Sequence, residues 1–164
     1  MSIADFLSEF EREAATTRRV LERVPSDKLT WAPHAKSMTI GKLSMHLAGG
    51  PKHISHWFLE DVYSFTPNPT PEPASTEEIL AAHDASVAAV REHLPKISDE
   101  SLTAPWSAKM GEQTLLAMPR GVAMRTLLMS HFYHHRGQLS VYLRLLDVKV
   151  PSIYGPSADE NPFG

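Results

Sequence analysis

The chain has 164 residues, of which 42% are hydrophobic, and it carries a formal net charge of −3 and no cysteine. A chain of this length can bury one core, and no change of composition marks a boundary, so we expect a single domain over residues 1–164. The missing cysteines exclude disulfides, thiolate metal sites and a protein thiol nucleophile. The acidic balance argues against nucleic acid as a partner, because nucleic-acid binding requires a concentrated basic face.

The N-terminal residues predict a first helix over about residues 3–24, which ends before Pro25. Its inward stripe consists of Ile3, Phe6, Phe10, Ala14, Thr17, Leu21 and Val24. Acidic residues appear early and no uninterrupted apolar segment follows, so this segment is neither a signal peptide nor a membrane span. We therefore expect a cytoplasmic protein that has no membrane partner.

A second helix follows a connector at residues 28–36, and Ser37 is a candidate for its N-cap. Its inward stripe begins with Ile40, Leu43, His46 and Leu47. Pro51 lacks an N–H and clashes with the preceding turn, so the pattern predicts a kink there or a division into two helices. The apolar face resumes afterwards with His53, Ile54, Trp57 and Phe58.

The middle of the chain alternates between loops and one further helix. Residues 66–74 contain four prolines and predict an extended loop. Ser75 and Glu78 have the spacing of a capping box and predict a third helix that ends before Pro95. Residues 96–119 lack helical periodicity, so we expect a long irregular stretch with a short extended piece at residues 114–116.

A fourth helix is predicted over residues 120–146. Alternating spacings of three and four residues give it a stripe of Met124, Leu128, His131, His135, Gln138, Tyr142 and Leu145. His131 and His135 lie one turn apart on the same face, which is the geometry by which a helix presents two imidazoles to one metal ion. A buried imidazole can equally be satisfied by a carbonyl or a carboxylate, so both interpretations stay open at this point.

Four amphipathic helices predict an all-α four-helix bundle with long connecting loops, and the core of such a bundle is a common place for metal sites. His46 faces inward on the second helix and could meet His131 and His135. His53 lies on the same face as His46 but ~10 Å further along the axis, too far to share an ion with it. We therefore treat His53 as a pocket residue.

Two stretches of the chain resemble the DinB superfamily of damage-inducible bacterial proteins. They are SMTIGKLSMHLAGGPKHISHWF and, further along, MRTLLMSHFYHHRGQLSVYLRLLDVKVPSIYGP. The most specific features are a lone inward histidine on the second helix and a His-His-Arg-Gly-Gln block on the fourth. The resemblance implies a four-helix bundle that binds one divalent metal through His46, His131 and His135, and it leaves His134 outside the ligand set.

The resemblance also implies activities that depend on a low-molecular-weight thiol or on metal-assisted hydrolysis. Three neutral imidazoles leave a metal its double charge and at least one open position, as in catalytic zinc sites. Our first hypothesis is a thiol-dependent S-transferase acting on a small molecule, with zinc as the first choice of metal and nickel as the second. The alternatives are a hydrolase that uses metal-bound hydroxide and a non-catalytic metal-binding stress protein. No catalytic acid or base is identified.

The substrate pocket is predicted from residues near the histidines and from segments that could cover the open end of the bundle. Gln138 and Tyr142 share the histidine stripe, and Trp106 and Tyr154 lie among turn-forming residues that suit a mobile wall. With His53, these residues form the predicted pocket. Arg120 and Arg136 are expected to be an ordinary surface charge and a solvated or ion-paired residue, respectively.

A homodimer is predicted from large apolar residues that lie outside the inward stripes of the first and fourth helices. They are Leu7, Val20, Leu127, Leu139 and Leu143. Helical surfaces of this kind often pack across a two-fold axis.

Overall fold

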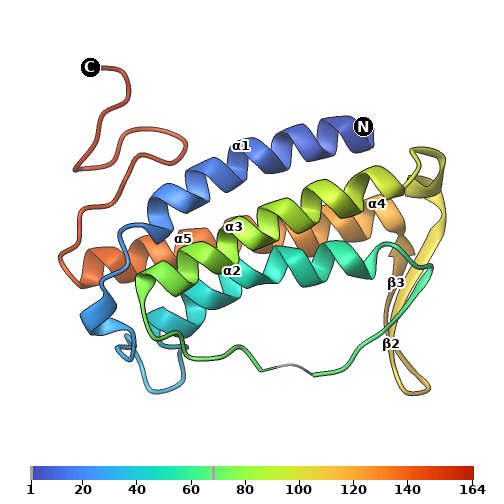
Figure 1. Cartoon of the computed structure of the whole chain (residues 1–164), viewed down its shortest axis with the longest axis horizontal. Helices are drawn as coiled ribbons and strands as arrows, with labels where there is room; N and C mark the ends of the chain where they lie inside the picture. The colour runs from blue at the N-terminus through green and yellow to red at the C-terminus, as the bar shows by residue number, and fades with distance from the viewer. Residues whose placement is uncertain (1, 68) are drawn as a thin grey trace.

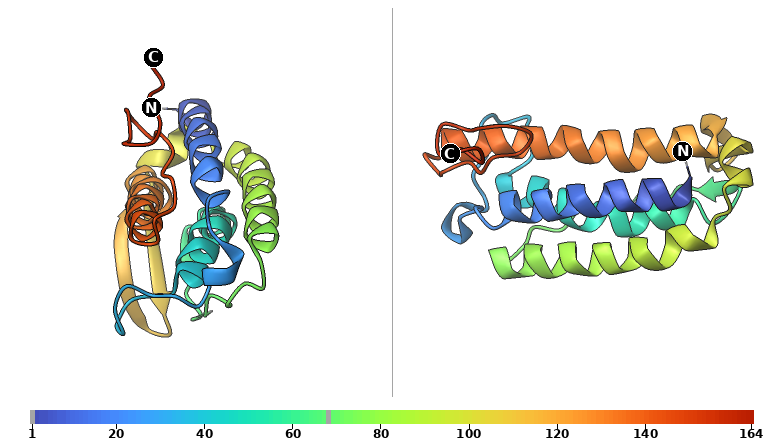
Figure 2. Two further views of the ribbon diagram at one scale, coloured as in Figure 1. Left: turned by 90° about the vertical axis from the view of Figure 1, so that its left-hand side faces the viewer. Right: turned by 90° about the horizontal axis from the view of Figure 1, so that it is seen from above.

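The computed structural model describes residues 2–67 and 69–164, and long helical segments lie side by side in it (Figure 1). Three of them are α1 (Ile3–Leu21), α2 (Ile40–Trp57) and α3 (Thr76–His93). The fourth is continuous and consists of α4 (Arg120–Ala123), the π-helical η4 (Met124–Ser130) and α5 (His131–Leu145). Two further views show these segments packed as one bundle (Figure 2), as the sequence predicted.

The starts of the helices follow from side-chain caps. Ser2 accepts a hydrogen bond from the Asp5 amide, and the Asp5 carboxylate accepts one from the Ser2 amide, which forms a capping box for α1. Ser75 caps α3 as predicted, by accepting from the Glu78 amide at 3.3 Å. The predicted cap at Ser37 is wrong, because Thr39 caps α2. The connector folds back through a backbone hydrogen bond from Ile40 to Trp31, so the helix begins only after Thr39.

Pro51 does not divide α2, since the helix runs through it to Trp57. A proline inside a helix removes one backbone hydrogen bond and strains the turn before it. Leu47 and Ile54 are nevertheless both buried on either side of Pro51, and α2 packs extensively along α3. Tertiary packing therefore holds the helix together across the break, and the prediction of two separate helices is wrong.

A small sheet covers one end of the bundle, and it corrects the all-α prediction (Figure 1). Its strands are β1 (Val62–Ser64), β2 (Pro105–Met110) and β3 (Gln113–Pro119). The strand β2 pairs in parallel with β1 and antiparallel with β3. The expected irregular stretch thus contains a hairpin, which turns at Gly111, whose φ of +58° favours glycine. The extended piece predicted at residues 114–116 lies within β3.

Among the described residues, three short 3₁₀ turns complete the helical elements: η1 (Ser26–Lys28), η2 (Leu94–Lys96) and η3 (Glu100–Thr103). In the described part of the chain, no helix is both long and apolar enough to cross a membrane.

The core divides into two clusters along the bundle. One includes Phe6, Phe10, Phe58 and the sheet residue Trp106, and the other lies around Leu21, Ile40, Leu47 and Phe132. Fully burying one such side chain stabilises the fold by roughly 1.5–3 kcal/mol.

The residues that suggested a homodimer belong to this core. Val20, Leu139 and Leu143 are fully buried within one chain, and Leu7 and Leu127 pack against the first cluster. The prediction of a dimer thereby loses the observation on which it was based.

Candidate metal centre

Three histidines from two helices converge in the middle of the bundle. His46 comes from α2, and His131 and His135 come from the start of α5. The Nε2 atom of His131 lies 3.4 Å from that of His46 and 2.8 Å from that of His135. The ligand atoms of all three residues lie within 4.8 Å of one another. The three histidines that the sequence predicted as ligands are thus placed to hold a metal ion.

The site lies where the two core clusters meet. Leu128 and Ile54 from the first cluster and Leu47 and Phe132 from the second line a cavity of about 10 Å³ beside the histidines. A cavity of this size is at the lower limit for one water molecule. The π-helical η4 ends directly before His131, and such segments, whose turns are wider than those of an α-helix, frequently occur at functional sites.

The three imidazoles are held in the neutral form that binds metal. Burial, followed by the repulsion that a charged imidazole would meet from His135 and His46, lowers the pKa of His131 to about 4. Burial also lowers the pKa of His46. For His135 burial again lowers the pKa, against a hydrogen bond to Gln138 that raises it. Each residue therefore offers a lone pair rather than a charge at neutral pH.

The other ring nitrogens of two ligands have hydrogen-bond partners. His135 Nδ1 lies 2.7 Å from Gln138 Oε1, which only accepts, so the imidazole donates and its Nε2 keeps a lone pair. His46 Nδ1 lies 3.4 Å from the Thr70 hydroxyl. Partners of this kind fix the orientation of metal-binding histidines. The ring nitrogens that converge are therefore the ones left free to bind a metal.

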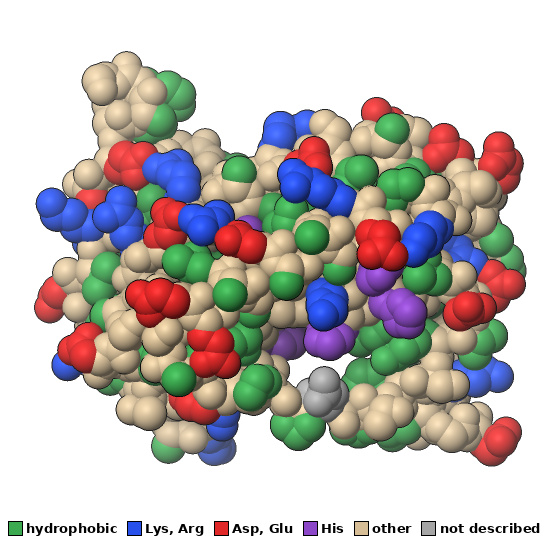
Figure 3. Space-filling model, viewed as in Figure 1, with side chains coloured by type: hydrophobic (Ala, Val, Ile, Leu, Met, Phe, Trp, Pro, Cys, Tyr) green, Lys and Arg blue, Asp and Glu red, His purple; other side chains and the backbone are tan. Residues whose placement is uncertain are grey.

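Thr70 comes from the proline-rich loop after β1, so this loop reaches the histidine centre. Glu72 ties the loop to the start of α2, because it accepts a hydrogen bond from Thr39 at 2.7 Å and lies 3.5 Å from Lys42. Figure 3 shows histidine side chains beside an opening on this face of the molecule.

A family model described as the DinB family matches residues 1–161. The chain belongs to the DinB family. It is 28% identical to the protein YrdA of Bacillus subtilis over 156 residues, which cover 94% of this chain and 89% of YrdA. A crystal structure of a DinB-like protein from Bacillus cereus aligns with a TM-score of 0.74 at 24% identity, over 93% of this chain and 98% of that one. A DinB-like structure from Bacillus subtilis aligns with a TM-score of 0.68 at 17% identity, over 97% and 96% of the two chains.

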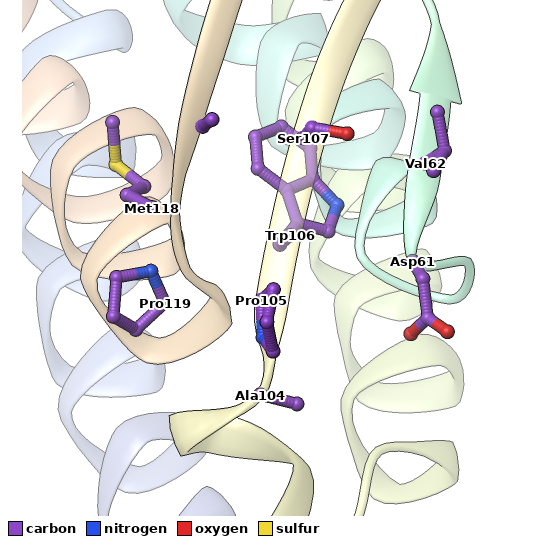
Figure 4. A pocket seen from close by; sticks show the side chains of 9 residues that line it. Asp61, Val62, Ala104, Pro105, Trp106, Ser107, Met118 and Pro119 are labelled. Atoms are coloured by element: carbon purple, nitrogen blue, oxygen red, sulfur yellow. The ribbon is translucent and has the colours of Figure 1, made fainter.

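Trp106 is not part of the wall of the histidine centre of this DinB family member. Its side chain is 1% exposed in β2, and its indole N–H donates to the Trp57 carbonyl at 3.2 Å. It lines a separate hollow of about 570 Å³, with Met118 and Pro119 on one side and Asp61 on the other (Figure 4). This hollow shares no lining residue with the histidine cavity. Strand pairing and burial hold the indole in place, so the contacts of Trp106 give no support to the predicted mobile wall.

The other four predicted pocket residues lie in four different surroundings. Gln138 is hydrogen-bonded to His135, one of the three candidate metal ligands. Tyr142 packs edge-on against Trp31 with ring centres 5.7 Å apart, and His53 is exposed on α2. The hydroxyl of Tyr154 donates to the Glu13 carboxylate of α1 at 2.9 Å. Of the five predicted pocket residues, the described contacts therefore place Gln138 at the histidine centre.

The predicted stripe of the fourth helix departs from the buried face beyond His135. Gln138 and Leu145 are exposed, whereas Leu139 and Leu143 are 0% exposed. A stripe that repeats every 3.5 residues drifts away from a helix of 3.6 residues per turn, and the wider π-helical turns add to the offset. Arg136 also lies on this buried face.

Two arginines that the sequence placed outside the core are buried. Arg136 is 1% exposed and forms an ion pair with Glu13 at 2.6 Å. Arg120 is 4% exposed, donates to the carbonyls of Phe58 and Glu60, and pairs with Asp61. The expectation of a surface charge at Arg120 is wrong, because its guanidinium satisfies the carbonyls at the end of α2.

Proposed function

We propose that this protein binds one divalent transition metal through His46, His131 and His135 and acts as a thiol-dependent S-transferase on a small molecule. The observation that carries the proposal is the convergence of three neutral imidazoles without a fourth ligand. Within residues 2–67 and 69–164, the group of potential ligands contains these three side chains and no carboxylate. Such a ligand set leaves a coordination position for a substrate, as in catalytic rather than structural zinc sites.

The donor set fits a borderline metal ion. Imidazole suits zinc, nickel, copper and iron, whereas magnesium and calcium prefer oxygen ligands. Zinc is our first choice and nickel the second. A divalent ion in this site would supply Lewis acidity and favour the thiolate form of an incoming thiol.

The surroundings of the histidines favour thiol chemistry over hydrolysis. The cavity beside them is lined by apolar side chains and a glycine, namely Leu47, Gly50, Pro51, Ile54, Leu128 and Phe132. Hydrolysis of an amide or ester profits from a nearby acid that protonates the leaving group. When a thiolate, whose proton has passed to solvent, displaces a stable anion from carbon, the carbon–sulfur bond forms as the leaving group departs, and no such acid is needed. Apolar walls exclude the water that competes with the thiol.

The protein's own residues keep the centre ready for this reaction. Burial keeps the imidazoles neutral, and Gln138 holds the His135 ring so that Nε2 faces the other ligands. The chain has no cysteine, so no internal thiol can occupy the open position.

Cobalt substitution tests the proposal. We expect a thiolate-to-cobalt charge-transfer band when a small thiol is added to the cobalt-loaded protein. His135→Ala should show neither the cobalt spectrum nor the band, and His134→Ala, one residue away on the exposed side, should show both. A cobalt spectrum that does not respond to thiol would contradict the thiol-dependent function and favour a hydrolase or a non-catalytic metal protein.

A further inference from the structure

A second pair of histidines meets outside the metal centre, at the end of the bundle where α2 and α3 both terminate. His56 lies in the last turn of α2 and His93 in the last turn of α3. Their ring centres are 5.4 Å apart, close to the separations of 4.4–5.1 Å among the three histidines of the metal centre. Two imidazoles from different helices can therefore reach one ion here.

A buried serine fixes the tautomer of His93. Ser55 is 0% exposed, and its hydroxyl donates to the Lys52 carbonyl at 3.1 Å. Since that hydrogen is already used, Ser55 Oγ accepts from His93 Nδ1, which lies 2.9 Å away. The lone pair of His93 is consequently left on Nε2. A histidine whose Nδ1–H is held by an outer partner is the usual form of a metal ligand.

The electrostatic surroundings also suit a cation bound through neutral imidazoles. Two helices end side by side, and the partial negative charge at helix C-termini favours a cation near their last turns. Burial lowers the pKa of His93, charge on His56 lowers it further, and Glu92 opposes both. Lys52 and Lys96 disfavour a cation, but Lys96 is paired with Glu92 at 2.7 Å.

We propose that His56 and His93 form a second site for a divalent transition metal, with water in the remaining coordination positions. The site binds more weakly than the metal centre, because it has two imidazoles rather than three and His56 is exposed. It is independent of that centre, since His56 lies ten residues beyond His46, or ~15 Å along the helix. An ion held by two ligands, one exposed and one half-buried, exchanges readily with solution.

Equilibrium dialysis of the metal-free full-length protein against copper(II), which has the highest affinity for such ligands, tests the proposal. We expect two copper ions per chain for the unaltered protein and one for the His56→Ala/His93→Ala variant. His53→Ala is the matched control, because His53 is an exposed histidine on the same helix, and it should retain two. Ser55→Ala should weaken the second site by about 10-fold and leave the first unchanged.

The His46→Ala/His131→Ala/His135→Ala variant separates the two sites, because it should keep one copper ion per chain. Circular dichroism checks that each variant is folded. Saturation of the unaltered protein at one ion would overturn the proposal, and so would a second ion that persists in the His56→Ala/His93→Ala variant. Loss of the second ion from His53→Ala would show that the ligands are wrongly assigned.

Discussion

His135 and Arg136 are neighbours on α5, yet their side chains contact different helices of the bundle. His135 faces α2, where it joins two other neutral imidazoles whose Nε2 atoms converge. Arg136 faces α1, where its guanidinium donates to the Glu13 carbonyl, the Thr17 hydroxyl and the Glu13 carboxylate. On the α2 side, imidazole lone pairs therefore remain available to a ligand from solution. On the α1 side, protein groups satisfy the buried charge of Arg136. Within one helix, His135 therefore belongs to the candidate binding site and Arg136 to the contacts that stabilise the fold.

The network on the α1 side extends beyond Arg136. Its guanidinium lies over the rings of Tyr133 and Tyr154, 5.5 and 5.0 Å from their centres. Tyr133 donates to Glu9 at 2.7 Å, and Arg125 binds both oxygens of the same carboxylate. These contacts attach the C-terminal tail and α5 to α1, so we expect this side to be the main polar contribution to stability.

The largest expected effect is on stability and follows from Arg136→Ala. Removing one partner of a buried ion pair leaves Glu13 without its charge partner and costs about 3–5 kcal/mol of unfolding free energy. Urea unfolding measures this cost. Arg144→Ala is the matched control, because Arg144 pairs with Asp159 on the exposed side of α5, and it should cost less than about 1 kcal/mol. Equal costs for the two variants would contradict the distinction between the two sides.

Metal removal should have the next largest effect on stability, and this effect should come from His46, His131 and His135. A metal ion whose free concentration is one hundred times its dissociation constant stabilises the folded state by about 2.7 kcal/mol. A chelator should therefore lower the thermal unfolding midpoint of the unaltered protein in differential scanning calorimetry. The comparison is made in the His56→Ala/His93→Ala variant, which lacks the proposed second site. In that background the midpoint should fall on chelation, whereas adding His46→Ala should abolish the response, and a response that persists would place the stabilising ion elsewhere.

Gln138→Ala should weaken metal binding by about 10- to 100-fold, because the His135 ring loses the acceptor that orients it. Competition against a colorimetric chelator measures the affinity. Gln138→Glu keeps an acceptor oxygen and should restore most of the affinity. If Gln138→Ala binds metal as tightly as the unaltered protein, the orienting role of this hydrogen bond is refuted.

A smaller effect is expected from Glu9 on the α1 side at low pH. The hydrogen bond from Arg125 lowers the pKa of Glu9 from an ordinary 4.5 to about 2. A carboxyl with a lowered pKa stabilises the folded state above its unfolded pKa and loses that contribution as pH falls from about 4.5 to about 2. The urea midpoint of the unaltered protein should fall more steeply across this range than that of Glu9→Gln. Parallel curves would show that the pair contributes nothing.

The sequence predicted those parts of the centre that follow from helix periodicity. The spacing of His131 and His135 and the inward position of His46 were sufficient to bring three imidazoles together. Thr70 could not be predicted, because it comes from a loop whose path has no periodic signal. His56 and His93 belong to different helices, and no pattern within one helix tells how its neighbour is rotated.

The fold was predicted least well in short strands and at buried charges, where hydrophobic periodicity gives no clear signal. Trp106 lies in a six-residue strand, which is too short for its alternation of buried and exposed residues to stand out. The ion pair that the sequence allowed for Arg136 is present with Glu13, but its burial was not predicted, because a buried charge is revealed only by its partners on α1.

The most direct test of the histidine centre is the metal content of two variants that differ by one position. Metal analysis of the protein purified with its native metal should give about one ion per chain at the centre, which His135→Ala should lose and His134→Ala should retain. Both variants should unfold at similar urea concentrations once the metal is removed. Retention of the ion by His135→Ala together with its loss from His134→Ala would contradict the assignment of His46, His131 and His135 as the ligands.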